Sequence, residues 1–263
     1  MENLKLAYFS PTGTTAKVIH EIARGMTPES PETLDLTSPQ ARTETLCSSA
    51  KELLILAVPV YMGRIPAILD GLNQLRLERT PVVCVVVYGN RAYEDALLEL
   101  GAAVKKRGGI PVAGAAFIGE HSFSSPELPT AHARPDAQDL KQAYDFGCQI
   151  KAKLEQLSDN LEKQQVEFPG NRPYGGLTKL WDVDFISVDE KCTQCGLCAE
   201  ICPANAISTE KSSSIDIVKC ISCCACIKKC PANARSIKPG PVQDAAHRLN
   251  SLFNARKEPE IFI

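Results

Sequence analysis

The chain has 263 residues, of which 44% are hydrophobic and 23% charged, and its 29 basic side chains nearly balance 31 acidic ones. This composition excludes wholesale disorder, and without a basic block there is no case for nucleic-acid binding. The apolar runs are far shorter than the ~18 residues of a membrane span, and the N-terminus lacks the apolar stretch of a signal peptide. We therefore expect a cytoplasmic protein that binds neither membrane nor nucleic acid.

Short apolar runs rich in Val, Ile and Leu alternate with helix-like stretches through residues 1–165. Continuous apolar runs are typical of strands buried on both faces. This alternation predicts an α/β fold with a doubly wound, five-stranded parallel sheet. The predicted strands are residues 4–9, 33–36, 53–58, 82–87 and 111–118. The predicted helices are residues 14–25, 43–51, 65–75, 92–106 and 136–164.

The composition changes after residue 165. Residues 166–182 are rich in proline, glycine and aromatic side chains, which indicates a linker arm. Residues 183–240 contain most of the cysteines, and residues 241–263 begin with a helix-like stretch and end in a tail. We expect an α/β domain, an arm, a small cysteine-rich domain and a C-terminal helix with its tail.

Nine of the twelve cysteines lie between positions 192 and 230, and this segment is internally duplicated. The pattern C-x-x-C-x-x-C-x-x-x-C-P begins at Cys192 and again at Cys220, and each copy continues with the tetrapeptide PANA. The first three thiolates of such a pattern surround one cubane cluster, and in two-cluster ferredoxins the cysteine before proline ligates the other cluster. The spacing therefore predicts two [4Fe–4S] clusters. One is assigned to Cys192, Cys195, Cys198 and Cys230, and the other to Cys220, Cys223, Cys226 and Cys202.

A four-cysteine zinc site is the alternative. Zinc would need two C-x-x-C pairs and would leave four of these thiols without a role. Cys224 breaks the spacing, and we interpret it as a small buried residue rather than a ligand, with redox sensing as the other reading. The segment resembles bacterial-type ferredoxins with two [4Fe–4S] clusters, over positions 183–238, and we expect an α+β ferredoxin domain.

A hydroxyl-rich loop follows the first predicted strand and opens the first predicted helix. A helix N-terminus offers unpaired N–H groups, so this loop predicts a phosphate site. The loop matches neither the P-loop motif nor the G-x-G-x-x-G motif. Its hydroxyl groups carry no charge, which favours a phosphate monoester over a metal–triphosphate complex. A plain N-cap of Ser and Thr is the alternative. The loop consists of Ser10, Pro11, Thr12, Gly13, Thr14 and Thr15.

Two further loops follow strand ends, where α/β sheets bind ligands. With the hydroxyl-rich loop they resemble the FMN-binding loops of flavodoxins, over residues 1–160. The resemblance implies that residues 10–15 hold the FMN phosphate and that the other loops flank the isoalloxazine ring. Tyr61 would stack on the ring or lie at its rim, and the backbone near Met62 and Gly63 would bond flavin N5. These two loops are Pro59, Val60, Tyr61, Met62 and Gly63, and Tyr88, Gly89, Asn90 and Arg91.

Three charged or titratable side chains of these loops are of interest. Arg64 and Arg91 stand where flavodoxins usually carry acids, and a guanidinium near the flavin would raise its potential. The alternative is that Arg91 points to solvent. His121 follows the fifth predicted strand, and we expect a rim residue rather than an acid catalyst.

The order of domains resembles the flavodoxin–ferredoxin fusion proteins of anaerobic bacteria and archaea. This resemblance covers nearly the entire chain and implies electron transfer between the clusters and FMN. Three functions fit: an electron-transfer flavoprotein that converts between one- and two-electron chemistry, an FMN-dependent reductase of a small organic acceptor, and a cluster-stabilised binding module. The expected partners are redox proteins or a small-molecule acceptor, and no oligomeric state is assigned. Direct use of NAD(P)H is not expected, because no dinucleotide fingerprint is present.

Overall fold

The computed structural model describes residues 3–27, 29–155, 165–176 and 183–263. One six-stranded sheet lies at the centre of the N-terminal unit, in the order β10-β7-β6-β4-β1-β2. Five of these strands are parallel neighbours, and in chain order they give the flavodoxin-like arrangement 2-1-3-4-5. The five predicted strands are thus confirmed. They are β1 (Asn3–Tyr8), β2 (Glu32–Asp35), β4 (Glu52–Pro59), β6 (Pro81–Tyr88) and β7 (Ile110–Ile118).

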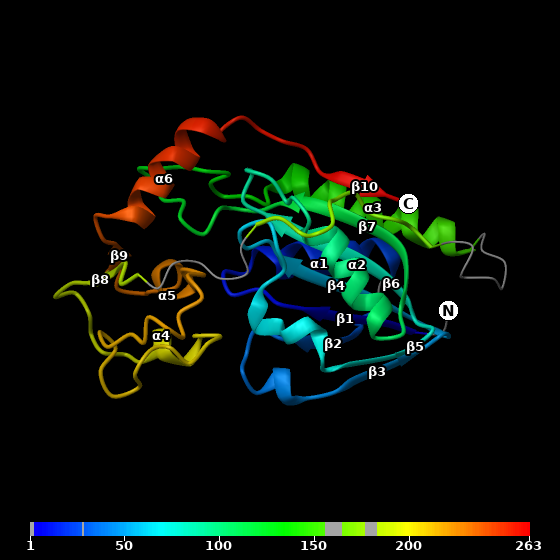
Figure 1. The fold of residues 1–263 in the computed structure, drawn as a ribbon, viewed down its shortest axis with the longest axis horizontal. Helices are drawn as coiled ribbons and strands as arrows, with labels where there is room; N and C mark the ends of the chain where they lie inside the picture. Colours follow the sequence, from blue (N-terminus) through cyan, green and yellow to red (C-terminus); the bar gives the residue numbers. More distant parts are fainter. Residues whose placement is uncertain (1–2, 28, 156–164, 177–182) are drawn as a thin grey trace.

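Helices cover both faces of the sheet, as Figure 1 shows. On one face α1 (Thr14–Met26) packs against α3 (Ala137–Glu155), and on the other lie α2 (Ala96–Lys106) and the 3-10 helix η2 (Ala67–Leu72). Successive residues of a strand point to opposite faces, so Leu54 enters one core while Ile55 enters the other. This burial on both sides explains the continuous apolar runs. Predicted residues 156–164 of the last helix lie outside the described residues.

Two predicted helices are wrong. Residues 43–51 contain β3 (Leu46–Ser49), which pairs in parallel with β5 (Leu75–Glu78), preceded by the single 3-10 turn η1 (Ala41–Thr43). Both strands alternate between inward and outward side chains, and that period of two suits a strand. The only helical element within residues 65–75 is η2, because Asp70 and Gly71 adopt positive φ and interrupt the helix.

The cysteine-rich unit has its own small core and a two-stranded antiparallel sheet. Its elements are β8 (Ile186–Val188), α4 (Leu197–Glu200), α5 (Ala225–Lys228) and β9 (Arg235–Ile237). The backbone repeats the duplication seen in the sequence. The helices α4 and α5 lie at equivalent positions of the two repeats, and three pairs of equivalent residues have positive φ. These pairs are Gln194 and Ser222, Gly196 and Cys224, and Asn205 and Asn233.

The C-terminal segment returns from the cysteine-rich unit to the α/β unit (Figure 1). Helix α6 (Pro241–Leu252) lies where the sequence predicts a helix. The expected tail instead contains a strand, β10 (Glu260–Phe262), which pairs antiparallel with the edge of β7 and extends the five-stranded parallel sheet to six strands. The two units are therefore joined at both ends of the cysteine-rich segment.

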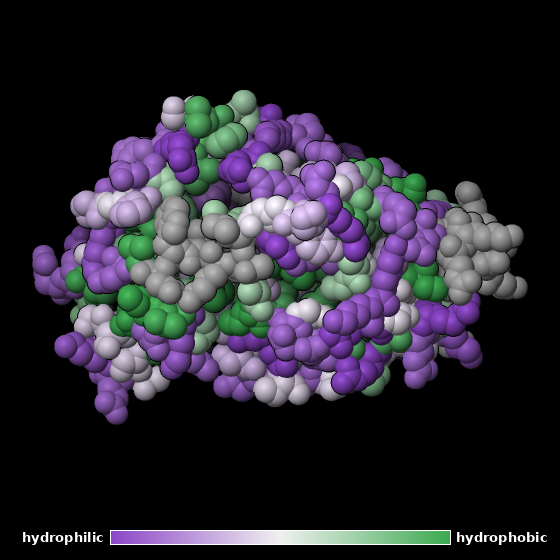
Figure 2. All heavy atoms as spheres, viewed as in Figure 1, coloured by the Kyte–Doolittle hydropathy of each residue, from purple (hydrophilic) through white to green (hydrophobic). Residues whose placement is uncertain are grey.

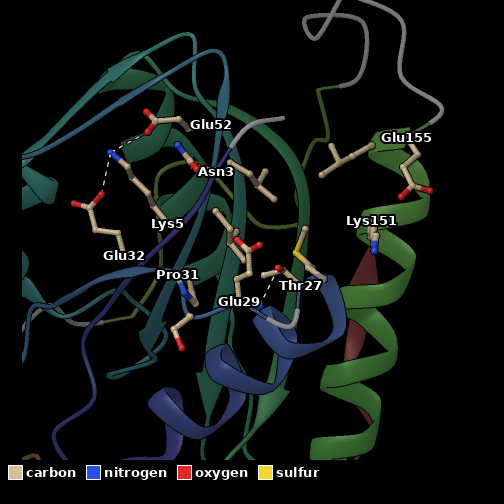
Figure 3. A pocket seen from close by; sticks show the side chains of 14 residues that line it. Asn3, Lys5, Thr27, Glu29, Pro31, Glu32, Glu52, Lys151 and Glu155 are labelled. Atoms are coloured by element: carbon tan, nitrogen blue, oxygen red, sulfur yellow. Dashed lines mark hydrogen bonds and ion pairs between the residues drawn. The ribbon is translucent and has the colours of Figure 1, made fainter.

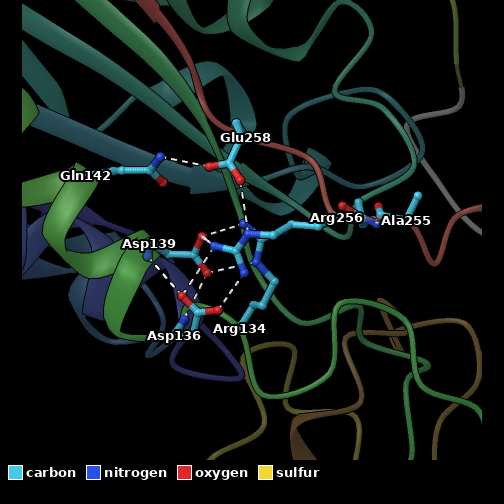
Figure 4. A network of polar contacts seen from close by, with 8 residues as sticks. Arg134, Asp136, Asp139, Gln142, Ala255, Arg256 and Glu258 are labelled. Carbon is cyan, nitrogen blue, oxygen red and sulfur yellow. Dashed lines mark hydrogen bonds and ion pairs between the residues drawn. The ribbon is translucent and has the colours of Figure 1, made fainter.

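An ion-pair network around one buried pair anchors this returning segment (Figure 4). Arg134 pairs with Asp139, both nearly inaccessible to solvent. Arg256 of the tail pairs with Asp136 at 2.6 Å and with Asp139 at 3.0 Å. The hydrogen bonds from Arg256 hold the pKa of Asp136 well below its usual range. The tail is thus bound to the start of α3 by charge-assisted hydrogen bonds.

The described part of the arm, residues 166–176, packs on the α/β unit. Asp95 accepts hydrogen bonds from the backbone N–H of Asn171 at 2.7 Å and of Gly175 at 2.6 Å. The Phe168 ring packs edge-on to Phe262 of β10. Arm residues 177–182 lie outside the described residues. Figure 2 shows apolar atoms gathered near the border of the two units, on a face that is otherwise mostly polar.

None of the helices in the described part of the chain has the length and apolar character that crossing a membrane requires.

Candidate redox site between the two units

A hollow of about 400 Å³ lies where the two units meet. The loops after β4, β6 and β7 line one side of it, at the carboxyl ends of the parallel strands. The other side is lined by α6, through Arg248, and by residues 220–226 of the second repeat, through Ser222. We call residues 220–226 the second cysteine loop. The predicted residues that line the hollow are Val60, Tyr61, Met62, Gly63, Tyr88, Gly89 and Arg91.

The hydroxyl-rich loop has the features of a phosphate cradle. Its Gly13 is the N-cap of α1 with φ 93°, and open space lies where a Cβ would stand. Thr15 is fully buried, yet its Oγ1 has no hydrogen-bond partner among the described residues. Ser10 Oγ accepts the N–H of Ala16 at 2.9 Å, which leaves the earlier N–H groups of the helix start for a ligand. An orphaned buried hydroxyl at a helix N-terminus fits a phosphate.

This cradle lies next to the hollow but does not line it. Gly119, at the end of β7, lies so near the cradle that an added Cβ would stand 3.1 Å from Thr14 Cβ. Two residues further along, His121 lines the hollow. The loop after β7 therefore connects the two places, as an FMN that spans them would require.

The loop after β4 makes a tight turn beside the hollow. Tyr61 and Arg64 exchange backbone hydrogen bonds at 2.9 and 3.1 Å, with Met62 at φ 52° and Gly63 at φ 81° between them. The φ of Gly63 lies in the left-handed region that favours glycine, and an added Cβ would also require the Glu94 side chain to move. This turn exposes the Met62 side chain beside the hollow.

Tyr61 lies beside the second cysteine loop, since it lines a neighbouring hollow together with Cys220 and Ile221. Burial raises the pKa of its phenol, and the nearby Cys223, Cys224 and Cys220 raise that pKa further. The same side chain lines the hollow. Tyr61 is therefore the residue of the α/β unit that brings the predicted flavin loops next to the predicted cluster ligands.

Two loop residues, Arg64 and Asn90, have surroundings that differ from the expectations, whereas Arg91 lies where it is expected. Arg64 pairs with Glu99 at 2.7 Å and stacks over the Tyr174 ring, so it does not line the hollow. Arg91 does line it and also pairs with Glu94 at 2.8 Å. Asn90 is 1% exposed and donates its amide hydrogens to the tail. The Asn90 side chain therefore holds the C-terminal segment, and its role toward FMN stays a prediction.

His121 forms part of the wall. Its Nδ1 accepts the N–H of Phe123 at 3.0 Å, which leaves the proton of the neutral ring on Nε2. Burial, together with Lys228 and Arg91, lowers the pKa of His121 to about 4. A neutral imidazole at neutral pH suits a hydrogen-bonding wall residue.

A thiol of the first repeat, that of Cys202, lies near the thiols of the second cysteine loop. Burial raises the pKa of Cys226 to about 11, and Cys220 and Cys202 contribute to this rise. Burial also raises the pKa of Cys223, again with contributions from Cys202 and Cys220. Cys202 of the first repeat thus lies near the three cysteines of the second, as the ligand exchange between repeats requires. Iron would deprotonate these thiols outright.

Backbone and side-chain donors surround the cysteine sulfurs, as a cluster needs. Ala206 donates its N–H to Cys202 at 3.3 Å, and at the equivalent position of the second repeat Ala234 donates to Cys230 at 3.4 Å. Arg235 donates to Cys198 at 3.1 Å. These donors fit iron–sulfur ligation by the cysteines of the duplicated segment. Among the described residues, no three His, Cys, Asp or Glu side chains are arranged to hold a single metal ion.

A larger hollow, of about 610 Å³, lies at the opposite end of the sheet (Figure 3). It is lined by the first residues of β1, β2 and β4, which are the amino ends of parallel strands. Lys5 there pairs with Glu52 at 3.1 Å and with Glu32 at 3.3 Å. Since α/β sheets bind ligands at their carboxyl ends, this hollow is not the candidate site.

Sequence reasoning missed two contributors to the site. The first is α6, whose Arg248 and Leu249 close the hollow; nothing in its sequence pattern indicates where it packs. The second is Arg235, which replaces the Ile207 of the first repeat. A comparison of the two repeats, residue by residue, would have found it.

Residues 186–208 match the family model of the 4Fe-4S binding domain. No curated protein matches the chain.

Several solved flavodoxins are similar to the chain. One, from the domain Archaea, is 12% identical with a TM-score of 0.37, and covers 58% of this chain and 99% of its own. A Fusobacterium nucleatum flavodoxin bound to flavin mononucleotide is 20% identical with a TM-score of 0.40, at the same coverages. A short-chain flavodoxin associated with a PDU bacterial microcompartment is 15% identical with a TM-score of 0.40, and covers 59% of this chain and 99% of its own.

The strand order is that of a flavodoxin-like α/β unit, and the family match identifies a 4Fe–4S binding domain after it in the chain. This combination is consistent with a flavodoxin–ferredoxin fusion.

Proposed function

We propose that this protein is an iron–sulfur flavoprotein that carries electrons between two [4Fe–4S] clusters and FMN. The observation that carries the proposal is the shared hollow, which is lined by the predicted flavin loops and by the second cysteine loop. When bound, FMN takes up one or two electrons and each cluster one, so the chain would convert between one- and two-electron chemistry.

Different residues would bind the FMN phosphate, face the flavin ring and hold the clusters. Thr15 and the N–H groups at the start of α1 would bind the phosphate, and the turn from Tyr61 to Gly63 would face the ring. Cys220, Cys223, Cys226 and Cys202 would hold the cluster nearer to the hollow. The remaining predicted ligands, Cys192, Cys195, Cys198 and Cys230, would hold the farther cluster. External electrons would then pass through the farther cluster first, in the cytoplasm, with redox proteins as partners.

A second candidate function is the reduction of a small organic acceptor at the flavin. A second hollow, of about 460 Å³, shares Tyr61 and Met62 with the first and is lined largely by apolar side chains. Such a space beside the flavin loops would admit an acceptor. Steady turnover with a quinone, an enone or a disulfide would favour this candidate over electron transfer alone.

Anaerobic purification with quantified iron, sulfide and flavin tests the proposal. It predicts about eight iron atoms, about eight sulfides and one FMN per chain. Tetrahedral zinc in place of iron, or material without flavin, would overturn it.

A further inference from the structure

One buried side chain breaks the symmetry of the duplicated unit. The two repeats share the tetrapeptide PANA, but the next residue is Ile207 in the first repeat and Arg235 in the second. Both positions are buried, and Arg235 is only 5% exposed. A guanidinium therefore stands inside the cysteine-rich unit where the first repeat has an aliphatic side chain.

The contacts of Arg235 are with sulfur and with a carbonyl rather than with a carboxylate. Its Nη2 donates to Cys198 Sγ at 3.1 Å and to the carbonyl of Ser212. It also lies within hydrogen-bonding reach of Cys226, a predicted ligand of the other cluster. Its Nη1 is buried without a partner, and no acidic side chain among the described residues pairs with it.

A buried cation without a counter-charge is strongly unfavourable, and buried charges in proteins are paired or bound to metals. A [4Fe–4S] cluster with four thiolates has a charge of roughly −2 when oxidised and one unit more negative when reduced. Its sulfur atoms would accept from the unpartnered Nη1, and its negative charge would balance the guanidinium.

We propose that Arg235 is a tuning residue, which raises the reduction potential of the cluster held by Cys198. Reduction adds one electron from an external one-electron reductant, and no bond or proton is exchanged at Arg235. Because the added charge is negative, the guanidinium stabilises the reduced state more than the oxidised state. Hydrogen bonds to the sulfurs act in the same direction. This inference rests on the proposed function, since it requires the clusters.

The test is a redox titration of the intact protein, followed by electron paramagnetic resonance, with Arg235→Gln and Arg235→Lys. Loss of the signal in Cys195→Ser identifies the cluster that contains Cys198. At a fixed potential, Arg235→Gln should lower the ratio of reduced to oxidised cluster tenfold, which is about 59 mV for a one-electron couple. Arg235→Lys keeps the charge and should stay within about threefold of the wild type.

The matched control is Lys229→Gln, which removes a positive charge from an exposed side chain next to Cys230. Solvent screens such a charge, so the ratio should change less than about threefold. Should Arg235→Gln not assemble its clusters, Arg235→Ile, which copies the first repeat, is titrated with the same expectation.

An unchanged ratio in an assembled neutral variant would overturn it, and so would an equal change in Lys229→Gln. Neither result would affect the proposed function, which fails only if the wild-type protein contains no clusters. Iron content, measured on every variant, separates the two failures.

Discussion

The side-chain amide of Asn90 donates a hydrogen bond of 2.6 Å to the backbone carbonyl of Phe253, at the end of α6. A second hydrogen bond, of 2.8 Å, reaches the carbonyl of Ala255. Asn90 lies in the loop after β6, between Gly89 and Arg91, which both line the hollow. The loop that lines the predicted flavin site therefore also holds the segment that closes it.

Replacing Asn90 with alanine should weaken the joining of the two units. The change leaves two carbonyls without their donor, which costs about 1–3 kcal/mol. Anaerobic unfolding in denaturant should show this loss in the free energy of unfolding. Asn254→Ala, at an exposed position between the two acceptors, is the control and should stay within about 0.5 kcal/mol of the wild type. Equal stabilities of the two variants would contradict the anchoring role.

Thr15→Val should separate phosphate recognition from ring recognition. Valine keeps the shape of threonine but removes the buried hydroxyl that has no partner among the described residues. We expect FMN to bind about tenfold more weakly, because one hydrogen bond to a charged phosphate is worth about 1.5 kcal/mol. Riboflavin, which lacks the phosphate, should bind the variant and the wild type equally. Thr33→Val, on an exposed position of β2, is the control, and a parallel loss for riboflavin would count against the assignment.

The adjacent residues Cys223 and Cys224 should differ in iron binding. Cys224 stands at φ 58°, where the first repeat has Gly196 at φ 79°, and its thiol is buried. Cys224→Gly should keep the full iron content, with stability within about 1 kcal/mol, since relief of the left-handed backbone offsets lost packing. Cys223→Ser should lose about half of the iron. Loss of iron in Cys224→Gly would show that the ligand assignment is wrong.

The buried His121 should make the protein less stable in mild acid. Its pKa is about 4 in the folded protein and about 6.5 in an unfolded chain. Between these values the unfolded chain binds more protons, so stability decreases as the pH falls from 6.5 toward 4. His121→Asn should flatten this dependence in denaturant titrations at several pH values. His247→Asn, on an exposed position of α6, should keep the wild-type slope, and an unflattened slope in His121→Asn would refute the prediction.

The sequence was sufficient for the parts of the fold where one pattern dominates. Strands such as β6 are buried on both faces, so their apolar runs are unambiguous. The stretch at residues 43–51 is short, and its alternation was too weak to separate a strand from a helix. The strand β10 has only three residues, and its place is decided by Arg256, Tyr93 and Phe168, whose partners lie far away in the sequence.

In the candidate site too, local sequence patterns indicate some features, whereas others depend on tertiary packing. The cysteine spacing and the hydroxyl-rich loop are local patterns, and their chemistry can be read without coordinates. The approach of Tyr61 to the second cysteine loop, where it shares a hollow with Cys220 and Ile221, is a tertiary arrangement that no local pattern indicates. The pairing of Arg64 with Glu99, rather than with a ligand, likewise depends on the approach of α2 to the turn after β4.

Anaerobic stopped-flow mixing of the fully loaded protein with a one-electron reductant tests the central claim most directly. Because the hollow is lined by both units of one molecule, reduction of FMN after the clusters should follow a rate constant independent of protein concentration. A rate constant that rises in proportion to protein concentration, or clusters that reduce while FMN stays oxidised, would contradict the account.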